Sequence, residues 1–329
     1  MDISPAPKRV IMLGATGTAG LATTRALLAA GHHVTCLVRD TAKVPGDIAE
    51  HAAVREADVT RRASVVAALG GERFDALVSC LASRTGGPKD AWAIDHAAHV
   101  TALDAAQGVG LSQMVLMSAI CVQKPLLAFQ HAKLAFEKHL IASGVTYSIV
   151  RPTALFKSLS GQIERVKNGK PFLIFGDGEL TACKPISDAD LGAFMAECLR
   201  DPAKHNAILP IGGPGPAYTL KAQGELLFEL TGQPVKFRSV PVRMFDVIAG
   251  VLSAVGTILP KARDKAEFAR IGRYYATESM LVLDPVTGQY DANATPEYGT
   301  QTLRAHYEEV LAGRAQVALR EHAVFDSAG

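Results

Sequence analysis

The stretch Arg9–Gly31, RVIMLGATGTAGLATTRALLAAG, joins an apolar run, a glycine-rich turn and a helical pattern. The apolar run predicts a buried strand over Arg9–Leu13, and Gly31 stands where a helix-ending glycine is expected. Glycine permits a tight turn, lets backbone N–H groups approach a phosphate, and allows a helix to pack closely on a strand. The stretch therefore predicts a dinucleotide-binding unit whose cofactor contacts are Gly14, Thr16, Gly17, Thr18 and Gly20.

The spacing of these glycines is G-x-x-G-x-x-G, which matches the G-x-G-x-x-G fingerprint only loosely. A tight turn that binds no ligand is the alternative interpretation. Because the triplet lies directly between a predicted strand and a predicted helix, the cofactor interpretation is favoured.

Short apolar runs and helical patterns continue to alternate through the first two thirds of the chain. We expect further strands at His33–Val38, Ala53–Glu56, Ala76–Cys80, Met114–Met117, Ser148–Val150 and Ile208–Ile211. We expect helices at Gly20–Ala30, Ser64–Leu69, Ala93–Gly108 and Lys133–Ser143, the last ended by Gly144. This alternation predicts an α/β fold with a Rossmann-type, doubly wound parallel sheet.

The regular alternation ends after Arg151-Pro152. Residues 169–187, GKPFLIFGDGELTACKPIS, predict an extended segment with a hairpin-like turn at residues 176–178, and Ser187 predicts the cap of a helix over Asp188–Leu199. From Pro214 onward helical and loop patterns dominate. We expect an NAD(P)-binding core over residues 1–214, with residues 153–185 contributing to the substrate side, and a smaller C-terminal substrate lobe over residues 215–329.

The composition of the 329 residues excludes several classes of protein. Hydrophobic residues make up 48% and the mean hydropathy is +0.16, which excludes a disordered chain. The formal net charge of +2 is too balanced for a protein that binds nucleic acid through its phosphates. A charged fraction of only 20% is compatible with an apolar small-molecule ligand.

Cysteine usage and the apolar segments indicate where such a protein works. The five cysteines form no C-x-x-C pair and stand mostly in apolar runs, which predicts reduced, buried thiols. The first residues lack the apolar stretch of a signal peptide. The nearly uncharged run Val247–Leu259 reaches about 20 Å as a helix, less than a hydrocarbon core of about 30 Å. We expect a soluble, cytoplasmic protein.

One histidine pair, His96-x-x-His99, has the spacing of two metal ligands on one helical face. No third ligand stands at a useful spacing, so surface histidines or histidines with protein hydrogen-bond partners are the favoured interpretation. We expect no metal site.

The residue after the second predicted strand selects the cofactor. An acid there bonds the ribose 2′-hydroxyl of NAD, whereas Arg39 favours the 2′-phosphate of NADPH. We predict NADPH; Asp40 on an NAD ribose, with Arg39 in solvent, is the competing interpretation. By position, the following residues would line the adenine and ribose sides: Asp58, Val59, Leu81 and Ala82.

The glycine spacing, the length and the strand order resemble the short-chain dehydrogenase/reductase superfamily, and in particular its atypical, NmrA-like branch. That family uses a serine after the fifth strand and Tyr-x-x-x-Lys in the next helix. Ser118 occupies the serine position, and Phe129-Gln130-His131-Ala132-Lys133 carries the lysine with phenylalanine in place of the tyrosine. The resemblance implies catalytic roles for Lys133 and Ser118, with Lys133 holding the nicotinamide ribose, and places Arg151 and Pro152 beside the nicotinamide.

Phe129 is the departure from that pattern. In carbonyl reduction a tyrosine hydroxyl protonates the developing alkoxide, and a phenyl ring has no proton to give. Either the protein is no enzyme, or its substrate develops negative charge elsewhere, for example over a conjugated carbon framework.

Three longer segments resemble the NADPH-dependent divinyl chlorophyllide 8-vinyl reductases of phototrophs: residues 129–140, 151–191 and 274–303. The resemblance implies reduction of the C8 vinyl group of 3,8-divinyl (proto)chlorophyllide a to ethyl, in (bacterio)chlorophyll synthesis. The substrate would be a Mg-chlorin or Mg-porphyrin whose macrocycle takes up the negative charge. Expected substrate contacts are Phe129, Phe156, Tyr274 and Tyr275. The candidates for the proton donor are Lys133, Tyr147, the Tyr274-Tyr275 pair and water.

Two other interpretations stay open on the sequence alone. A redox-sensing regulator of the NmrA type would bind the dinucleotide without turnover, and a related reductase would act on a smaller phenolic substrate. The apolar segment Met244–Leu259 also has alternatives: a core helix by default, a flap over the macrocycle, or a weak contact with the surface of the photosynthetic membrane.

Overall fold

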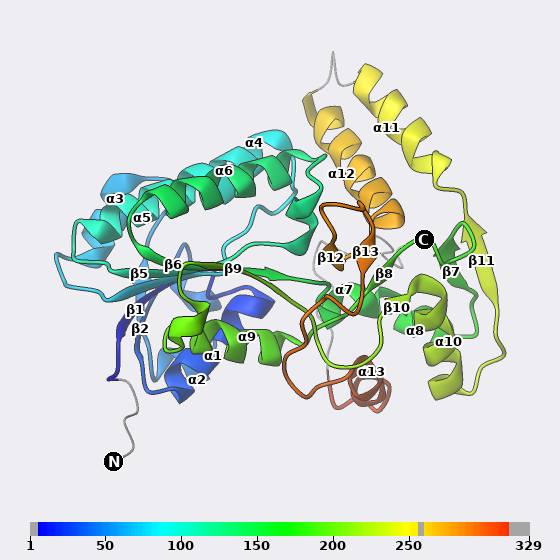
Figure 1. Ribbon diagram of the computed structural model, residues 1–329, viewed down its shortest axis with the longest axis horizontal. Coiled ribbons are helices and arrows are strands. Elements are labelled where there is room, and N and C mark those ends of the chain that lie inside the picture. Colours follow the sequence, from blue (N-terminus) through cyan, green and yellow to red (C-terminus); the bar gives the residue numbers. More distant parts are fainter. Residues whose placement is uncertain (1–5, 256–259, 316–329) are drawn as a thin grey trace.

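A seven-stranded parallel sheet forms the centre of the computed structural model, which describes residues 6–255 and 260–315 (Figure 1). The strand order is β3-β2-β1-β4-β5-β6-β9. Because the order reverses between β1 and β4, the carboxyl ends of these strands form the crevice in which doubly wound folds bind ligands. The strands are β1 (Arg9–Leu13), β2 (His33–Val38), β3 (Ala53–Glu56), β4 (Ala76–Ser79), β5 (Gln113–Met117), β6 (Thr146–Pro152) and β9 (Ala207–Ile211).

Helices cover both faces of this sheet, as the near-continuous apolar strands require. Val10 and Met12 of β1 belong to the core on the side of α1 (Thr18–Ala29) and α9 (Asp188–Glu197). Ile11 and Leu13 belong to the core on the opposite side, which Figure 1 shows covered by α3 (Arg62–Leu69), α5 (His99–Gln107) and α6 (Ala128–Ala142). The predicted doubly wound α/β fold is confirmed.

Most sequence-predicted elements of the core are present. All seven predicted strands form, and β1, β2 and β3 have the predicted bounds. Gly31 and Gly144 adopt φ values of +82° and +77°, as expected for residues that end helices. The Ser187 hydroxyl accepts a hydrogen bond from the backbone N–H of Asp190 at 2.9 Å and so caps α9.

Two helices differ from prediction. The single helix expected over Ala93–Gly108 is divided into α4 (Pro88–Ala91), a π-helical turn η2 (Trp92–Ala98) and α5. Helix α6 starts five residues earlier than predicted because the Gln130 side chain accepts hydrogen bonds from the backbone N–H groups of Leu126 and Leu127. The Phe129–Lys133 segment is therefore helical throughout.

A second, smaller unit packs beside the carboxyl edge of the sheet, and we call it the C-terminal lobe. Its core contains Phe156, Phe172, Leu227 and Tyr307, so it draws on residues from both sides of residue 214. Its elements are α7 (Phe156–Leu159), α8 (Ile163–Lys167), β7 (Phe172–Phe175), β8 (Ala182–Cys183), β10 (Tyr218–Thr219), α10 (Leu220–Thr231), β11 (Phe237–Val240) and α13 (Leu303–Leu311).

The hairpin predicted around residues 176–178 is wrong in its pairing, although the turn itself forms. β7 pairs in parallel with β11, whereas β8 pairs antiparallel with β10. Both strands find their partners far away in the sequence, and a local turn pattern carries no information about such pairs. The short remaining elements are α2 (Gly46–Ala49), η1 (Thr41–Lys43), η3 (Ile120–Gln123), η4 (Ser160–Gln162), η5 (Pro202–Lys204), β12 (Val282–Leu283) and β13 (Tyr290–Asp291).

Helices α11 (Arg243–Val255) and α12 (Pro260–Thr277) lie side by side at one end of the molecule (Figure 1). Phe245 faces inward, against Gly272 and the ring of Phe175. Val247 and Val251 are 65% and 59% exposed, so the expectation that this segment is core is wrong for the outer face of α11. A single packed neighbour buries one face of a helix and leaves the other in solvent.

Parts of two predicted segments lie outside the described residues: 256–259 of the apolar segment and 316–329 of the C-terminal lobe. Within the described ranges, no helix has the length and apolar character needed to span a membrane. All five cysteines are free and buried, which confirms the predicted reduced thiols.

Candidate functional site

The turn between β1 and α1 leaves no room for side chains at two of its glycines. A Cβ atom at Gly14, whose φ is +77°, would lie 2.7 Å from the carbonyl carbon and oxygen of Cys80 at the end of β4. A Cβ atom at Gly20 would lie 1.9 Å from the carbonyl oxygen of Gly14. Gly14 and Gly20 are therefore required by the close approach of backbone segments.

Gly17 is different, because the fold itself leaves it space. A Cβ atom there would meet only the Gly14 carbonyl oxygen, at 3.5 Å. Gly17 is the N-cap of α1, no side chain of residues 6–255 or 260–315 caps this helix end, and the first turn has no acidic residue. Free N–H groups and the helix dipole attract an anion at such an end, and the missing side chain at Gly17 lets a phosphate approach.

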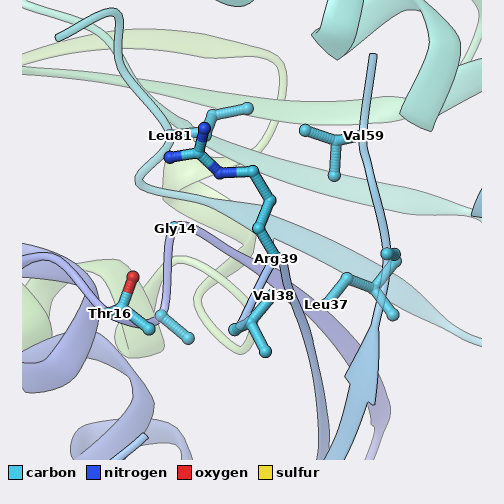
Figure 2. A pocket seen from close by; sticks show the side chains of 9 residues that line it. Gly14, Thr16, Leu37, Val38, Arg39, Val59 and Leu81 are labelled. Carbon is cyan, nitrogen blue, oxygen red and sulfur yellow. The ribbon is translucent and has the colours of Figure 1, made fainter. Parts of the chain in front are cut away.

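A pocket opens beside this turn at the carboxyl ends of β1, β2 and β4 (Figure 2). Five of its lining residues were predicted as cofactor contacts: Gly14, Thr16, Arg39, Val59 and Leu81. The others, which the sequence reasoning missed, are Ala15, Leu37, Val38 and Ala57. This pocket has the position and the lining for the adenosine part of a dinucleotide.

Arg39 and Asp40 have different surroundings. Figure 2 shows the Arg39 side chain extending over the pocket toward Leu81. The Asp40 carboxylate instead accepts a hydrogen bond from the backbone N–H of Ala42 at 3.1 Å, and lies 3.3 Å from Lys43 Nζ. Asp40 thus caps η1, which favours Arg39 over Asp40 as the residue that selects the cofactor. Asp58 also serves its own loop, since its carboxylate accepts hydrogen bonds from the Thr60 backbone N–H and hydroxyl.

Lys133, predicted as catalytic, forms a buried ion pair. Its Nζ lies 3.0 Å from Oδ1 of Asp95, whose side chain is fully buried. Asp95 Oδ1 also accepts a hydrogen bond from the backbone N–H of Ser83 at 3.2 Å, in the loop after β4. Oδ2 of Asp95 has no hydrogen-bond partner among the described residues. One carboxylate therefore ties the lysine to the loop that carries Leu81 and Ala82.

The second predicted catalytic residue, Ser118, belongs to another buried network. Its hydroxyl donates a hydrogen bond to Glu137 Oε1 at 2.5 Å. Arg151 donates to the same carboxylate through Nε at 3.2 Å and through Nη2. The guanidinium predicted to contact the cofactor is thus held by Glu137, and the carboxylate fastens α6 to the ends of β5 and β6, where Pro152 is the last strand residue.

Phe129 and the two tyrosines predicted as substrate contacts do come together. Phe129 packs in one apolar cluster with Cys121, Tyr274 and Tyr275, beside the turn at Gly86. Phe129 stands one helical turn before Lys133, so both lie on the same face of α6. Phe156 is elsewhere: it is buried in the core of the C-terminal lobe against His306.

The tyrosine hydroxyl groups considered as proton donors differ in their hydrogen-bond partners, burial and location. Tyr274 Oη lies 2.8 Å and 3.1 Å from the carbonyl oxygens of Cys121 and Lys124, so its proton is bound to the backbone. Burial, together with the nearby Cys121 thiol, raises the pKa of Tyr275 well above its ordinary value. Tyr147 is near the amino end of β6, at the opposite end of the strand from Arg151.

The histidine pair shows no sign of metal ligation. Both ring nitrogens of His99 have protein partners, Ser79 Oγ at 2.8 Å and the Ile94 carbonyl at 3.0 Å. His96 stacks edge-on with Trp92. Among the described residues, no group of three or more histidines, cysteines or acids is arranged to hold a metal ion.

Comparisons with known proteins agree with this geometry. The NAD(P)H-binding family model matches residues 14–202. The divinyl chlorophyllide a 8-vinyl-reductase of Oryza sativa is 48% identical over 98% of this chain and 84% of its own length. The enzyme of that name from Arabidopsis thaliana is 45% identical, over 94% of this chain and 78% of its own length. Both are described as chloroplastic.

The chain belongs to the divinyl chlorophyllide a 8-vinyl-reductase family. Among solved structures, an NADPH-dependent quinone oxidoreductase from Escherichia coli shares the fold, with a TM-score of 0.69 and 19% identity, over 92% of this chain and 99% of the other. The 8-vinyl-reductase relatives and the NAD(P)H-binding family model establish an oxidoreductase with a nicotinamide cofactor, in line with the predicted NADPH, and the solved structure shows the Rossmann-type fold.

Three polar residues of this 8-vinyl-reductase family member escaped the sequence reasoning: Asp95, Glu137 and Lys157. No sequence pattern indicates that Asp95 faces Lys133, because a π-helical turn determines the face of the helix on which Asp95 lies. Glu137 follows Lys133 by one helical turn and suggests an ordinary surface ion pair, yet it is buried. Lys157 donates a hydrogen bond to Thr18 Oγ1 at 3.1 Å, a contact between lobe and core that no local pattern reveals.

The pocket geometry predicts that Arg39→Ala discriminates between the two nicotinamide cofactors. A guanidinium bound to a 2′-phosphate contributes about 1.5–3 kcal/mol, so we expect the Kd for NADPH to rise about 10- to 100-fold and the Kd for NADH to stay nearly unchanged. Fluorescence titration with both cofactors measures this. Arg238→Ala, at an exposed arginine of β11, is the control; an equal loss of both cofactors in Arg39→Ala would contradict the assignment.

Proposed function

We propose that the protein reduces the C8 vinyl group of 3,8-divinyl chlorophyllide a or protochlorophyllide a to ethyl, with NADPH as the reductant. The observation that carries the proposal is the apolar cluster around Phe129. At the place where a carbonyl reductase needs a phenol, this chain buries a phenyl ring one turn before a paired lysine. Such a site suits a substrate that stabilises its own negative charge.

The residues of the sheet edge fit NADPH. Gly17 leaves an open cradle at the uncapped start of α1, and Arg39 offers a cation at the far side of the adenosine pocket. When bound, NADPH supplies a hydride from its nicotinamide ring to the terminal carbon of the vinyl group. The protein contributes by holding the donor and acceptor carbons about 3–3.5 Å apart in a site without bulk water.

Lys133 is the residue we assign to the nicotinamide ribose. Its ammonium has three protons, and the Asp95 carboxylate fixes it from the buried side, which leaves donors free toward the site. Ser118 and Arg151 we assign to positioning rather than to contact with the cofactor, because both bind Glu137. They hold the start of the loop after β6 at the edge of the sheet.

The conjugated macrocycle takes the place of an acid catalyst at Phe129. Hydride addition at the terminal vinyl carbon leaves negative charge that spreads into the ring system, so no oxyanion has to be protonated. The carbon attached to the ring then needs one proton. Tyr147 is at the wrong end of β6 and the Tyr274 proton is bound to carbonyl groups, so we assign proton delivery to Lys133, directly or through a water that it binds.

We propose that the C-terminal lobe, together with the cluster around Phe129, encloses the substrate. The lobe core combines residues 153–185 with residues beyond 215. We assign contact with the aromatic macrocycle to Phe129 and Tyr275, because both belong to the cluster beside Lys133. Phe156 contributes through the lobe core instead, because its ring is only 3% exposed.

The regulator alternative has less support. Relatives named as reductases match this chain well beyond the dinucleotide-binding segment, over 94–98% of its length. A sensor without turnover would have no need for a buried ion pair that presents a lysine to the nicotinamide site. A smaller phenolic substrate likewise leaves the long C-terminal segments without a role.

We also propose weak attachment of the protein to a lipid surface through α11. Met244, Val247, Ile248 and Val251 recur at helical spacing and form an exposed apolar stripe. Phe268 of the neighbouring α12 is also exposed. A helix of this kind lies in the membrane interface with its apolar face down, and the proposed substrate is itself an apolar pigment that partitions there.

Anaerobic incubation of the purified protein with NADPH and divinyl chlorophyllide a tests the proposed function. We expect a product two hydrogens heavier, with the change confined to C8, measured by mass spectrometry and by proton NMR of the vinyl signals. Lys133→Ala serves as the matched variant, and we expect its kcat to fall about 100-fold, the scale of one acid–base contribution. NADPH binding without any product would support the sensor instead.

Restoring the missing phenol tests the role of the macrocycle. Phe129→Tyr adds a hydroxyl to the apolar cluster, where an unpaired polar group costs about 1–3 kcal/mol. We expect the thermal midpoint to fall and kcat to stay equal or decrease, measured by thermal scans and steady-state kinetics. A large acceleration would show that the reaction needs an acid at this position and would contradict the assignment.

Lipid binding through α11 is measured by co-sedimentation with phosphatidylcholine vesicles, with and without about 30% anionic lipid. The double variant Val247→Asp/Val251→Asp places two charges on the apolar stripe, and we expect it to lower the bound fraction at least about 5-fold without loss of NADPH affinity. Val286→Asp, at a valine that is 91% exposed in a distant loop, is the control. Equal binding by all three proteins would exclude α11 as the contact.

A further inference from the structure

Lys157 joins the C-terminal lobe to the cofactor-binding turn. It belongs to α7, and its Nζ donates a hydrogen bond to the Thr18 hydroxyl, in the first residue of α1, at 3.1 Å. The position of α7 is fixed by the two residues directly before Lys157. Leu155 pairs with Ile186 in a β-bridge, and the Phe156 ring is buried in the lobe core. The lysine is therefore held at this place by its neighbours rather than by an ion pair.

Lys157 reaches the amino end of α1. No side chain of the described residues caps this helix end, and its first turn carries no acidic residue. Thr16, two residues before Thr18, already lines the adenosine pocket on one side. Lys133, which we assign to the nicotinamide ribose, would mark the other end of the cofactor. A dinucleotide stretched between these two ends places its diphosphate beside Gly17 and Thr18, within reach of the Lys157 ammonium.

The local charge balance calls for a cation here. Asp188, the first residue of α9, is close enough to Lys157 for their charges to interact, and its Oδ1 is buried without a hydrogen-bond partner in the described chain. Burial raises the pKa of Asp188 to about 6. A carboxylate near a doubly charged diphosphate would oppose binding, and a nearby ammonium offsets that repulsion. Among the described residues Lys157 forms no ion pair that would occupy it.

We propose that Lys157 is a ligand of the cofactor's diphosphate, supplied by the C-terminal lobe. The ammonium is released from the Thr18 hydroxyl and binds a diphosphate oxygen, while the N–H groups of the α1 turn bind from the core. The cofactor is then held from both units of the protein, so its binding also fixes α7 and the lobe that encloses the substrate. The inference rests on NADPH as cofactor and does not depend on which tetrapyrrole is reduced.

Three ligands separate this site from the Arg39 site. NADPH contains both a 2′-phosphate and a diphosphate, NADH contains only the diphosphate, and 2′-AMP contains only the 2′-phosphate. For Lys157→Met we expect the Kd values of NADPH and NADH to rise by a similar factor, about 10-fold for one charged hydrogen bond, and that of 2′-AMP to stay unchanged. Arg39→Ala should show the complementary pattern, weaker NADPH and 2′-AMP with unchanged NADH.

Two further variants complete the experiment. Lys157→Arg keeps a cation and should retain cofactor affinity within about 3-fold, since a guanidinium also binds phosphate. Lys138→Met removes an exposed lysine on the outer side of α6 and should change none of the three Kd values. Thermal scans show whether Lys157→Met is folded; the arginine variant keeps the test valid if it is not.

Each other outcome contradicts the proposal in a recognisable way. Unchanged NADPH and NADH affinity in Lys157→Met excludes the diphosphate contact. An equal loss of 2′-AMP would place Lys157 at the adenosine end or show a general defect. Normal NADPH affinity with lost turnover of divinyl chlorophyllide would move Lys157 to the substrate and leave the proposed function intact. Failure of the proposed function alone would show as normal cofactor selectivity without product.

Discussion

The close approach of three backbone segments at Gly14 is the constraint on which the site depends. Gly14 sits against the end of β4, and Gly20 sits against Gly14, in both cases closer than any side chain allows. This contact sets the direction of α1, so its uncapped amino end faces the carboxyl edge of the sheet. Helix α9 approaches α1 just as closely, because Gly192 packs on the backbone of Ala22. The phosphate-binding turn is thus supported from two sides.

Charge at this edge includes two buried ion pairs and an exposed arginine. Lys133 is paired with Asp95 and Arg151 with Glu137, while Arg39 remains exposed beside the adenosine pocket. A buried ion pair gives little net stability, but losing one partner costs about 3–5 kcal/mol because the other charge is left uncompensated. These pairs therefore act mainly by fixing position. They keep Lys133 and Ser118 at defined positions while the cofactor and substrate bind and dissociate.

The sequence was sufficient for the sheet, the turn and the cofactor, because each depends on local patterns. Strand β1 ends in a continuous apolar run, the glycines follow it directly, and Arg39 comes directly after the next strand, β2. The pairing of β7 with β11 and the contact of Lys157 with Thr18 link distant parts of the chain and have no local signal. Asp95 was hidden for another reason: a helical pattern does not reveal a π-helical turn, which changes the face on which a residue lies.

The missing phenol is explained by packing as well as by chemistry. Phe129 fills a cluster in which the hydroxyl of Tyr274 already binds the backbone carbonyl groups of η3 and its following residue. That cluster joins α6 to α12, and therefore the lysine helix to the helix pair that carries the exposed apolar stripe. A polar acid at residue 129 would weaken this junction. In the proposed reaction the substrate delocalises its own charge and needs no acid, so the position can serve packing, which would keep water from the reacting carbons.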